Sequence, residues 1–394
     1  MTAYDFDTPT DPRATGSLKW TAAGSVLGEA RADVLPMWVA QMDFAPAPFL
    51  TRTAEAVAAR GQWGYFGQAA KLREATAWWQ GARHGWPADP DHMLATHGLG
   101  NAIGLCLQAL TEPGDGVVIF TPVYHEFTNK IRRNGRRVVE SPLAVREDGR
   151  FEMDLDALEA ALDGTERLMI ISQPHNPAGR IWTEAELRAL ADLCQRHDLV
   201  LISDEIHQDL LLPGRVHVPA ATAVPQAMER LVVLTAASKT FDIAGLRTGV
   251  MTIPDAALRE QIGRLHAALD IQPNVLGVEM SAAAYTEEGA AWVDALCAYL
   301  AGNAAVMAEG IAQIPGLSFM PMESTYLAWI DFAGTGMTVD EFTARVRDEA
   351  HIGTSPGRPF GTGGETCLRF NIGTQRSRVI EAVERLQAAF KDLQ

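Results

Sequence analysis

The sequence contains few cysteines and no excess of positive charge. Its 394 residues include only Cys106, Cys194, Cys297 and Cys367, and none of these has the C-x-x-C spacing used by zinc sites and redox-active disulfides. We therefore expect buried free thiols in a reducing cytoplasm. The net charge of −16 argues against wrapping around nucleic acid or docking on an anionic lipid surface.

Long hydrophobic runs, internal repeats and linker-like segments are also missing. No apolar run approaches membrane-spanning length, and residues 1–11 are acidic and lack the hydrophobic stretch of a signal peptide. We therefore expect a cytoplasmic protein with no membrane partner. The length allows two domains with large cores, and the absence of a spacer predicts that the domains are tightly joined.

Residues 168–203 carry the clearest structural pattern. Two short apolar runs, 168–172 and 199–203, are typical of buried strands, and Thr183 and Glu186 have the spacing of a capping box at the start of an intervening helix. Two strands joined in this way form a βαβ unit with parallel strands. The pattern predicts an α/β fold, in which chemistry takes place beyond the carboxyl ends of the strands.

A lysine follows another apolar run. Residues 231–235 indicate a buried strand, and Ser238 and Lys239 come just beyond its carboxyl end. A lysine partly removed from water loses its proton more easily and can form a Schiff base with a carbonyl group. Because an isolated Ser-Lys pair is more often an exposed loop, this interpretation depends on what else lies at the same edge.

Three further strand ends carry polar or aromatic side chains. Tyr124 follows the run 117–120, Asn176 follows 168–172, and Asp204 and His207 follow 199–203. Each has an ordinary explanation by itself, as a core tyrosine, a turn asparagine or a packing histidine. Their joint occurrence at separate strand ends favours one shared site.

Two other kinds of site are less well supported. Asp204, Glu205 and His207 could ligate a metal, but no further ligand has a recognisable position, so no metal is predicted. The small residues 98–101 open a helix and leave backbone N–H groups for an anion such as a phosphate. A dinucleotide site at this G-x-G would need an acidic residue after the next strand, and residues 121–124 contain none.

The rest of the chain is less patterned. Pro9, Pro12, Pro36, Pro46 and Pro48 are expected to break any helix in the first fifty residues, and the apolar segment 35–44 to pack on the body or on a neighbouring subunit. We expect a helix over 51–60 and an aromatic turn over 63–67, of a kind that subunit interfaces use. Beyond Pro254 we expect helix from 255 to 312 with a break at 272–274, then strands at 326–331 and 366–372.

The polar strand ends match the needs of pyridoxal phosphate. Its aldehyde needs a lysine (Lys239), its ring an aromatic neighbour (Tyr124), its nitrogen a carboxylate (Asp204) and its ring hydroxyl a hydrogen-bond donor (Asn176). Its phosphate needs the helix N-terminus at 98–101, where Arg247, eight residues after Lys239, can add charge.

The chain resembles the fold-type I pyridoxal-phosphate enzymes, the aspartate aminotransferase superfamily, over nearly its whole length. Within that group it is most similar to the MalY/PatB-like branch of bacterial cystathionine β-lyases. The matching stretches are 15–20, 35–44, 121–124, 174–180, 203–207, 238–241 and 368–372. The resemblance implies a large domain with a mostly parallel seven-stranded sheet between helices at 51–285, a smaller α+β domain at 286–394, and an N-terminal arm with part of the small domain at 1–50.

The resemblance also implies roles for individual residues. Lys239 would hold the cofactor as a Schiff base, Asp204 would pair with the ring nitrogen, Tyr124 would stack on the ring, and Asn176, assisted by His207, would bond the ring hydroxyl. The implied phosphate ligands are the backbone at Leu99 and Gly100, Arg247 and, from the other subunit of a homodimer, Tyr65, and Ser238 is also implied to bind the cofactor. The implied substrate-binding residues are Arg369, which would clamp the α-carboxylate with its forked guanidinium, together with Val39, Tyr65 and Asn176.

Some residues depart from the lyase pattern. Lyases of this branch commonly have Asp where this chain has Gln41 and Asn where it has Asp242, and they often lack the arginine found here as Arg247. Arg369 by itself could be merely the outward side of a strand. We expect a carbon–sulfur β-lyase that forms thiol, pyruvate and ammonia, with an aminotransferase as the alternative and a catalytically silent regulator as the lower one.

Overall fold

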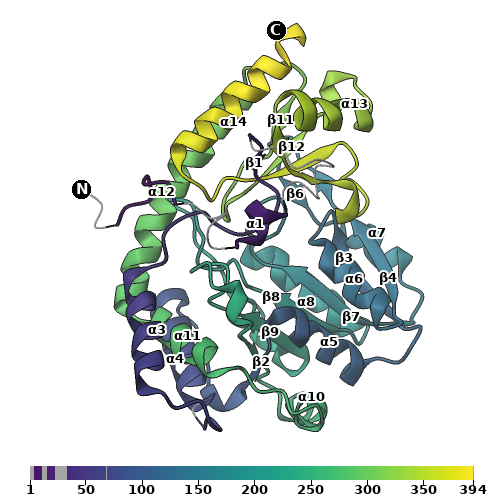
Figure 1. Ribbon diagram of the computed structural model, residues 1–394. Coiled ribbons are helices and arrows are strands. Elements are labelled where there is room, and N and C mark those ends of the chain that lie inside the picture. Colours follow the sequence, from purple (N-terminus) through teal and green to yellow (C-terminus); the bar gives the residue numbers. More distant parts are fainter. Residues whose placement is uncertain (1–3, 11–15, 23–32, 68, 394) are drawn as a thin grey trace.

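The computed structural model describes residues 4–10, 16–22, 33–67 and 69–393. Figure 1 shows a large sheet below a smaller one, with helices around both. The seven strands of the large sheet are, in spatial order, β2 (Met93–Thr96), β10 (Gly249–Thr252), β9 (Leu231–Thr235), β8 (Val200–Asp204), β7 (Glu166–Ser172), β3 (Gly116–Thr121) and β4 (Arg137–Pro142).

The large sheet is mostly parallel, as the sequence predicts. Each neighbouring pair from β9 to β4 is parallel, and β10 alone runs antiparallel to its neighbours β9 and β2. Strands β7 and β8 are joined by α8 (Glu184–Arg196), which begins at a capping box formed by Thr183 and Glu186. The predicted βαβ unit is therefore confirmed.

Both faces of this sheet are buried. Along β7, Leu168 and Ile170 pack in one hydrophobic cluster, and Met169 and Ile171 pack in another on the opposite face. The first cluster includes side chains of α5 (Leu99–Leu110), α6 (His125–Arg133) and α10 (Ala256–Ala268), and the second includes those of α8. Since the faces are covered, a site has room only at the ends of the strands.

Other helices near the large sheet differ in part from prediction. Helix α3 (Pro48–Arg60) begins at Pro48, so the expectation that this proline breaks a helix was wrong. The first turn of a helix needs no N–H donor, and proline fits there. The sequence pattern also missed the short α1 (Leu18–Thr21) and the long α4 (Ala69–His84). Three short elements, α7 (Leu155–Ala161), α9 (Ala220–Ala223) and the β5–β6 pair (Ala144–Val145 and Phe151–Glu152), complete this part.

The smaller sheet is antiparallel. Its order is β11 (Ser318–Phe319), β12 (Leu327–Asp331), β15 (Cys367–Asn371) and β14 (Ser355–Pro356), which confirms both predicted strands. It packs with α12 (Glu287–Ile311), α13 (Val339–Ala344) and α14 (Arg376–Ala389). The long helical stretch breaks before α11 (Val275–Ala284), as expected, and again between Ala284 and Glu287.

Helix α12 is long and apolar enough to cross a membrane by length and composition, which the sequence pattern did not lead us to expect. Its buried side chains, among them Trp292, Leu296 and Leu300, belong to the core that the small sheet shares with α14. The buried Asn303 donates hydrogen bonds to the carbonyl oxygens of Ile372 (2.9 Å) and Thr374 (2.8 Å). This is the packing of a core helix in a globular fold.

The apolar segment 35–44 packs on the body of the same chain. Strand β1 (Leu35–Pro36) pairs with β13 (Ile352–Gly353). Near the end of the segment, Asp43 lies 2.7 Å from the fully buried Lys19 and also accepts a hydrogen bond from the indole nitrogen of Trp20. Thr15, part of the resembling stretch 15–20, lies outside the described residues. The domain boundaries proposed from the sequence stay predictions.

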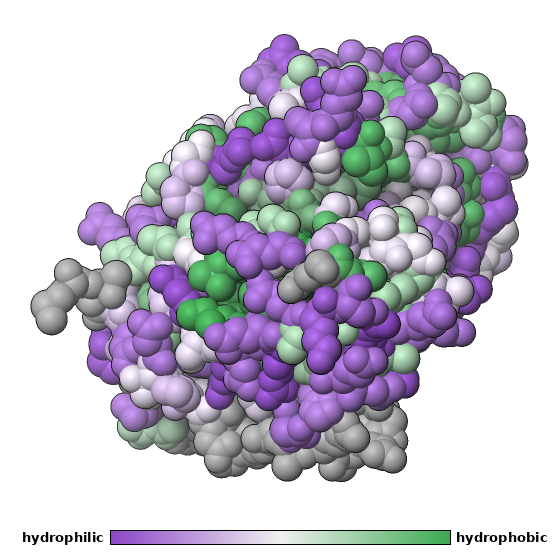
Figure 2. All heavy atoms as spheres, turned by 90° about the horizontal axis from the view of Figure 1, so that it is seen from above, coloured by the Kyte–Doolittle hydropathy of each residue, from purple (hydrophilic) through white to green (hydrophobic). Residues whose placement is uncertain are grey.

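Figure 2 shows the molecule from above, with a largely hydrophilic surface interrupted by separate hydrophobic patches.

All four cysteines are buried and free. Burial raises the pKa of the Cys106 thiol to about 12, so this sulfur is an inert core group rather than a nucleophile.

Candidate functional site

A cavity of about 440 Å³ lies beyond the carboxyl ends of β7, β8 and β9, beside the first turn of α5. It brings together most of the residues that the sequence singled out. Those that line it are Leu99, Gly100, Tyr124, Asn176, Asp204, His207, Ser238, Lys239 and Arg247. The four predicted strand ends therefore meet at one place.

Strand register sets the floor of the cavity. Asp204 is the last residue of β8 and is paired in register with Ser172 of β7 and Leu234 of β9. The hydroxyl of Ser172 accepts a hydrogen bond of 3.1 Å from the backbone N–H of Asn176. The carbonyl of Asn176 in turn accepts one of 3.0 Å from the N–H of Tyr124. Two neighbouring loops are thus fixed to each other and to the sheet.

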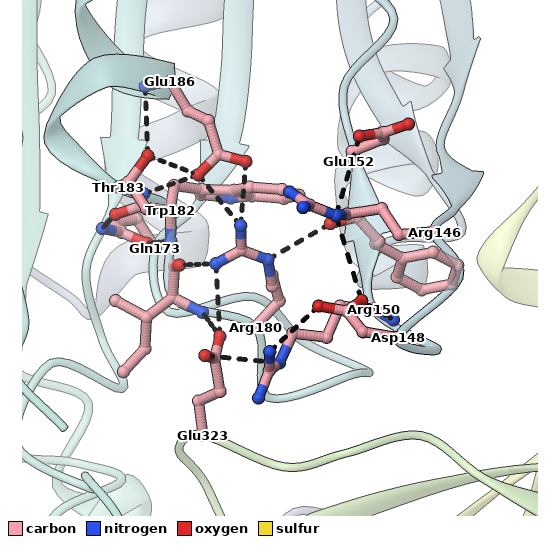
Figure 3. A network of polar contacts seen from close by, with 12 residues as sticks. Arg146, Asp148, Arg150, Glu152, Gln173, Arg180, Trp182, Thr183, Glu186 and Glu323 are labelled. Carbon is pink, nitrogen blue, oxygen red and sulfur yellow. Dashed lines mark hydrogen bonds and ion pairs between the residues drawn. The ribbon is translucent and has the colours of Figure 1, made fainter. Parts of the chain in front are cut away.

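The loop that carries Asn176 is anchored by Arg180 (Figure 3). The Arg180 guanidinium lies 2.8 Å from the carboxylate of Glu186 on α8 and 3.2 Å from that of Glu323, just before β12. Glu323 also accepts a hydrogen bond of 3.0 Å from the N–H of Ile181. Because these groups are largely buried, the ion pairs hold the loop against the segment that leads into the small sheet.

Lys239 reaches across the cavity to the segment 35–44. Its Nζ donates a hydrogen bond of 2.7 Å to the carbonyl oxygen of Ala40, which also accepts one of 3.2 Å from the hydroxyl of Tyr326. The side-chain amide of Asn371 donates to the carbonyl oxygens of Val39 and Gln41, at 2.6 Å each. The backbone that faces the lysine is therefore fixed on both sides of Ala40.

Burial sets the charge states of the central groups. It lowers the pKa of Lys239 to about 8, although the nearby carboxylate of Asp242 opposes this effect. Burial raises the pKa of Asp204 to about 7, against one hydrogen bond from the N–H of Ile206. Burial also lowers the pKa of His207 to about 3, so this imidazole is neutral at pH 7. A cation placed beside Asp204 would keep it ionised.

The first turn of α5 forms an anion-binding end of the cavity. Gly98 caps the helix with φ +78° and no side-chain capping bond, and Leu99, Gly100 and Asn101 of the first turn line the cavity. The N–H groups of Leu99 and Gly100 have no partner within the helix and can bind an anion. Arg247 follows a short 3₁₀ turn with φ +49°, which brings its backbone against Gly98. The Oδ1 atom of Asn101 is buried and has no hydrogen-bond partner among the described residues.

Three predicted residues do not line this cavity. Arg369 is buried behind Asn176, and burial lowers its pKa to about 10, so it stays a cation at neutral pH. Val39 contributes a carbonyl to the bond with Asn371 and stays partly exposed. Tyr65 is fully exposed and lies away from the cavity of its own chain. The proposed roles of all these residues stay predictions.

The sequence assigned no role at the site to several polar groups that lie near it. Asp242 accepts a hydrogen bond of 2.9 Å from the N–H of Met42, and burial raises its pKa to about 7. Asn371 and Tyr326 lie on or beside strands of the small sheet, and Lys130 lies on α6, where it lines the cavity. Only Asn371 stood within a resembling stretch, so a sequence signal for its role existed and was overlooked.

The metal alternative is not supported by the geometry. Glu205 points away from Asp204 and accepts hydrogen bonds from the hydroxyl of Ser203 (2.9 Å) and the N–H of Ala220 (2.9 Å). Its other oxygen lies 2.8 Å from Nε2 of the buried His217. Within the part of the chain that the structure describes, no cluster of three potential ligands is present.

The donor set fits pyridoxal phosphate. A buried carboxyl group at one strand end suits a ring nitrogen, a tyrosine ring suits the face, and a lysine amine with lowered pKa suits the aldehyde. The first turn of α5 and Arg247 suit the phosphate. Asn101, whose buried Oδ1 has no hydrogen-bond partner among the described residues, and Arg247 both line this end, which leaves polar groups there for a ligand.

Comparisons with known proteins point the same way. The model of the aminotransferase class I and II family matches residues 24–386. The chain is 34% identical to cystathionine beta-lyase PatB of Bacillus subtilis, over 98% of this chain and 99% of the relative. It is 31% identical to protein MalY of Escherichia coli, again over 98% of this chain and 99% of the relative. Pyridoxal-phosphate-containing cystalysin of Treponema denticola superposes with a TM-score of 0.94 at 31% identity, covering 99% of this chain and 100% of the other.

These matches extend over both sheets and every strand end that lines the cavity. The family depends on pyridoxal phosphate, in agreement with the donor set described above. The chain therefore belongs to the aminotransferase class I and II family, with the fold of the type I pyridoxal-phosphate enzymes.

Proposed function

We infer that the chain is a pyridoxal-phosphate-dependent carbon–sulfur β-lyase that acts on cystathionine or a related sulfur amino acid. The observation that carries this proposal is the convergence of Lys239 and Asp204, from the ends of neighbouring strands, on one cavity of about 440 Å³. Relatives named for this reaction match nearly the whole chain. A structural neighbour described as the C-S lyase of Staphylococcus hominis has a TM-score of 0.89 and 28% identity.

Bound pyridoxal phosphate would supply an electron-accepting ring that makes the α-proton of an attached amino acid acidic. We assign to Asp204 the task of keeping the ring nitrogen protonated, which its buried position at the floor of the cavity suits. We assign to Tyr124 the stacking contact and to Asn176 and His207 the ring hydroxyl. Neutral His207 can accept or donate a hydrogen bond without adding charge.

Lys239 is the proposed base. With a pKa of about 8, a useful fraction of its amine is unprotonated near neutral pH and can take the α-proton. The electron pair left on the α-carbon then forms a double bond to the β-carbon, and the carbon–sulfur bond breaks with release of a thiolate. The thiolate takes up the proton that Lys239 removed and leaves as a thiol, and the released enamine reacts with one water molecule to give pyruvate and ammonia.

Arg369 is the proposed ligand of the α-carboxylate. A buried guanidinium that is already oriented by neighbouring oxygens loses little freedom when it binds a carboxylate with two hydrogen bonds. The carbonyls of Val39 and Ala40 lie on the segment that faces Lys239, so this segment would border the substrate.

A homodimer would complete the site. Tyr65 and Trp63 are exposed on a segment without regular secondary structure, with exposed fractions of 113% and 58%. Large aromatic side chains left in solvent suit a subunit interface, and we assign Tyr65 to the phosphate of the partner subunit's cofactor. We also propose that the protein works in the cytoplasm, where buried free thiols stay reduced.

Transamination begins with the same proton removal and is the alternative reaction. It is favoured by Arg247 and Asp242, where the lyase pattern has other residues, and by more distant aminotransferase relatives such as arginine–pyruvate transaminase AruH of Pseudomonas aeruginosa, at 27% identity. A silent cofactor-binding regulator is the lower alternative. The presence of Lys239 and Asp204 in the cavity, with Arg369 bonded to Asn176 beside it, argues against it.

The test is a product assay on the purified protein with L-cystathionine and no keto acid. The lyase proposal expects continuous release of pyruvate and free thiol in equal amounts. Lys239→Ala should abolish turnover and covalent attachment of the cofactor after borohydride reduction, whereas Lys391→Ala, a change at an exposed lysine, should not. Dependence on added keto acid would favour transamination, and cofactor binding without turnover would favour the regulator.

A further inference from the structure

We propose that Lys130 is a second cationic ligand for the phosphate of the cofactor, in addition to Arg247. The inference rests on pyridoxal phosphate as the cofactor and not on the reaction that follows. Nothing in the sequence singled out Lys130, which lies in the last turn of α6 and lines the same cavity as Lys239.

The side chain of Lys130 lies beside the first turn of α5. A Cβ atom built on Gly100 would lie 3.4 Å from Cε of Lys130 and 3.8 Å from its Nζ. Gly100 is therefore in van der Waals reach of the lysine, and the ammonium group lies next to backbone N–H groups that have no partner within the helix. An alanine at position 100 would make an ordinary van der Waals contact with this side chain.

Positive groups gather at this end of the cavity. The N-terminus of a helix carries a partial positive charge, and Arg247 contacts the same turn through Gly98, whose built Cβ lies 3.9 Å from the Arg247 backbone. Lys130 and Arg247 thus both line the end of the cavity at which the positive end of α5 lies. A phosphate dianion bound at this end would be attracted by the helix N-terminus and by both side-chain cations.

The Lys130 ammonium has no other role among the described residues, where it forms no hydrogen bond or ion pair. The backbone carbonyl of Lys130 accepts a hydrogen bond of 2.8 Å from the side-chain amide of Asn134. Glu126, one turn earlier on α6, also lines the cavity, but it accepts a hydrogen bond of 2.8 Å from Asn129 and lies 3.9 Å from Arg133. Lys130 is therefore available for an anion.

The experiment compares two ligands that differ only in the phosphate. Full-length apoprotein is titrated with pyridoxal phosphate and with pyridoxal, for the wild type, Lys130→Gln and the exposed control Lys391→Gln. We expect Lys130→Gln to weaken binding of pyridoxal phosphate by about tenfold, as for the loss of one charge-assisted hydrogen bond, and to leave pyridoxal binding unchanged. Lys130→Arg should restore most of the affinity, and Lys391→Gln should change neither.

Inorganic phosphate gives an independent readout. It should compete with pyridoxal phosphate for the wild-type apoprotein more strongly than for Lys130→Gln. Equal weakening of both ligands, or no change in either, would overturn the proposal. So would an unchanged cofactor affinity combined with a raised KM for amino acids, because Lys130 would then bind substrate. If the wild type itself fails to bind pyridoxal phosphate, the cofactor assignment falls as well.

Discussion

The guanidinium of Arg369 on β15 donates a hydrogen bond of 2.9 Å to the side-chain oxygen of Asn176, on the loop after β7. This contact joins the small sheet to the large one at the edge of the cavity. It uses the oxygen of the Asn176 amide, so the nitrogen stays available as a donor. The second terminal nitrogen of Arg369 donates to the carbonyl of Trp38 at 3.0 Å, which fixes the plane of the guanidinium.

The first prediction concerns Arg369. Arg369→Lys keeps the charge but loses the fork that holds Asn176 and binds two carboxylate oxygens. We expect KM for the amino acid to rise by about tenfold or more, and cofactor affinity to change less, through Asn176. Steady-state kinetics and cofactor titration check this, with the exposed Arg358→Lys as control. An unchanged KM would remove Arg369 from the substrate site.

The second prediction concerns the anchor of the Asn176 loop. Glu323 lies within 3.2 Å of Arg180 and of Arg215, and Glu323→Gln removes the charge that these guanidinium groups share. We expect a loss of about 2 kcal/mol in the free energy of unfolding, because Arg180 is left buried with one carboxylate partner, Glu186. Denaturant unfolding measures this free energy, and Glu384→Gln, a change at an exposed position, is the control. Equal stability of the two variants would contradict the anchor.

The third prediction concerns pH. The Asp242 carboxylate raises the pKa of Lys239 by favouring the ammonium form, against the stronger effect of burial. Asp242→Asn should therefore lower this pKa. The rate at which apoprotein captures pyridoxal depends on the free amine, so its inflection should move from about pH 8 in the wild type to lower pH in the variant, by about one pH unit.

Asp192→Asn serves as the control for this measurement, because Asp192 is exposed and lies on α8. A variant whose inflection stays in place, or moves to higher pH, would show that Asp242 does not act on the lysine.

The fourth prediction concerns the buried pair formed by Lys19 and Asp43. Lys19→Met leaves the Asp43 carboxylate buried, with Arg378 3.7 Å away as its remaining cationic neighbour. Removal of one partner of a buried pair commonly costs about 3 kcal/mol, and we expect a loss of that size in thermal or denaturant unfolding. Lys391→Met should have little effect. If both substitutions cost the same, the pair does not stabilise the N-terminal segment.

The chemistry-bearing strand ends could be predicted from local pattern. An apolar run followed by turn residues marks the carboxyl end of a buried strand, and Lys239, Asp204 and Asn176 all follow such runs. Parallel strands put these ends at one edge, so a few local signals were enough to predict convergence.

Other features of the site depend on contacts between distant segments. Lys239 meets the carbonyl of Ala40, and Lys130 meets Gly100, although neither pair shares a local pattern. Helix α4 was missed because its mixed polar and apolar residues give a weak periodic signal, and packing decides its position.

The sequence by itself determined the parallel sheet, the cofactor class and the ends at which chemistry can take place, because backbone periodicity and turn chemistry act over a few residues. Only the tertiary structure decided which charges face the phosphate end, how Arg369 is oriented and what lowers the pKa of Lys239. Burial and long-range electrostatics arise from segments brought together by folding, and no short stretch of sequence contains them.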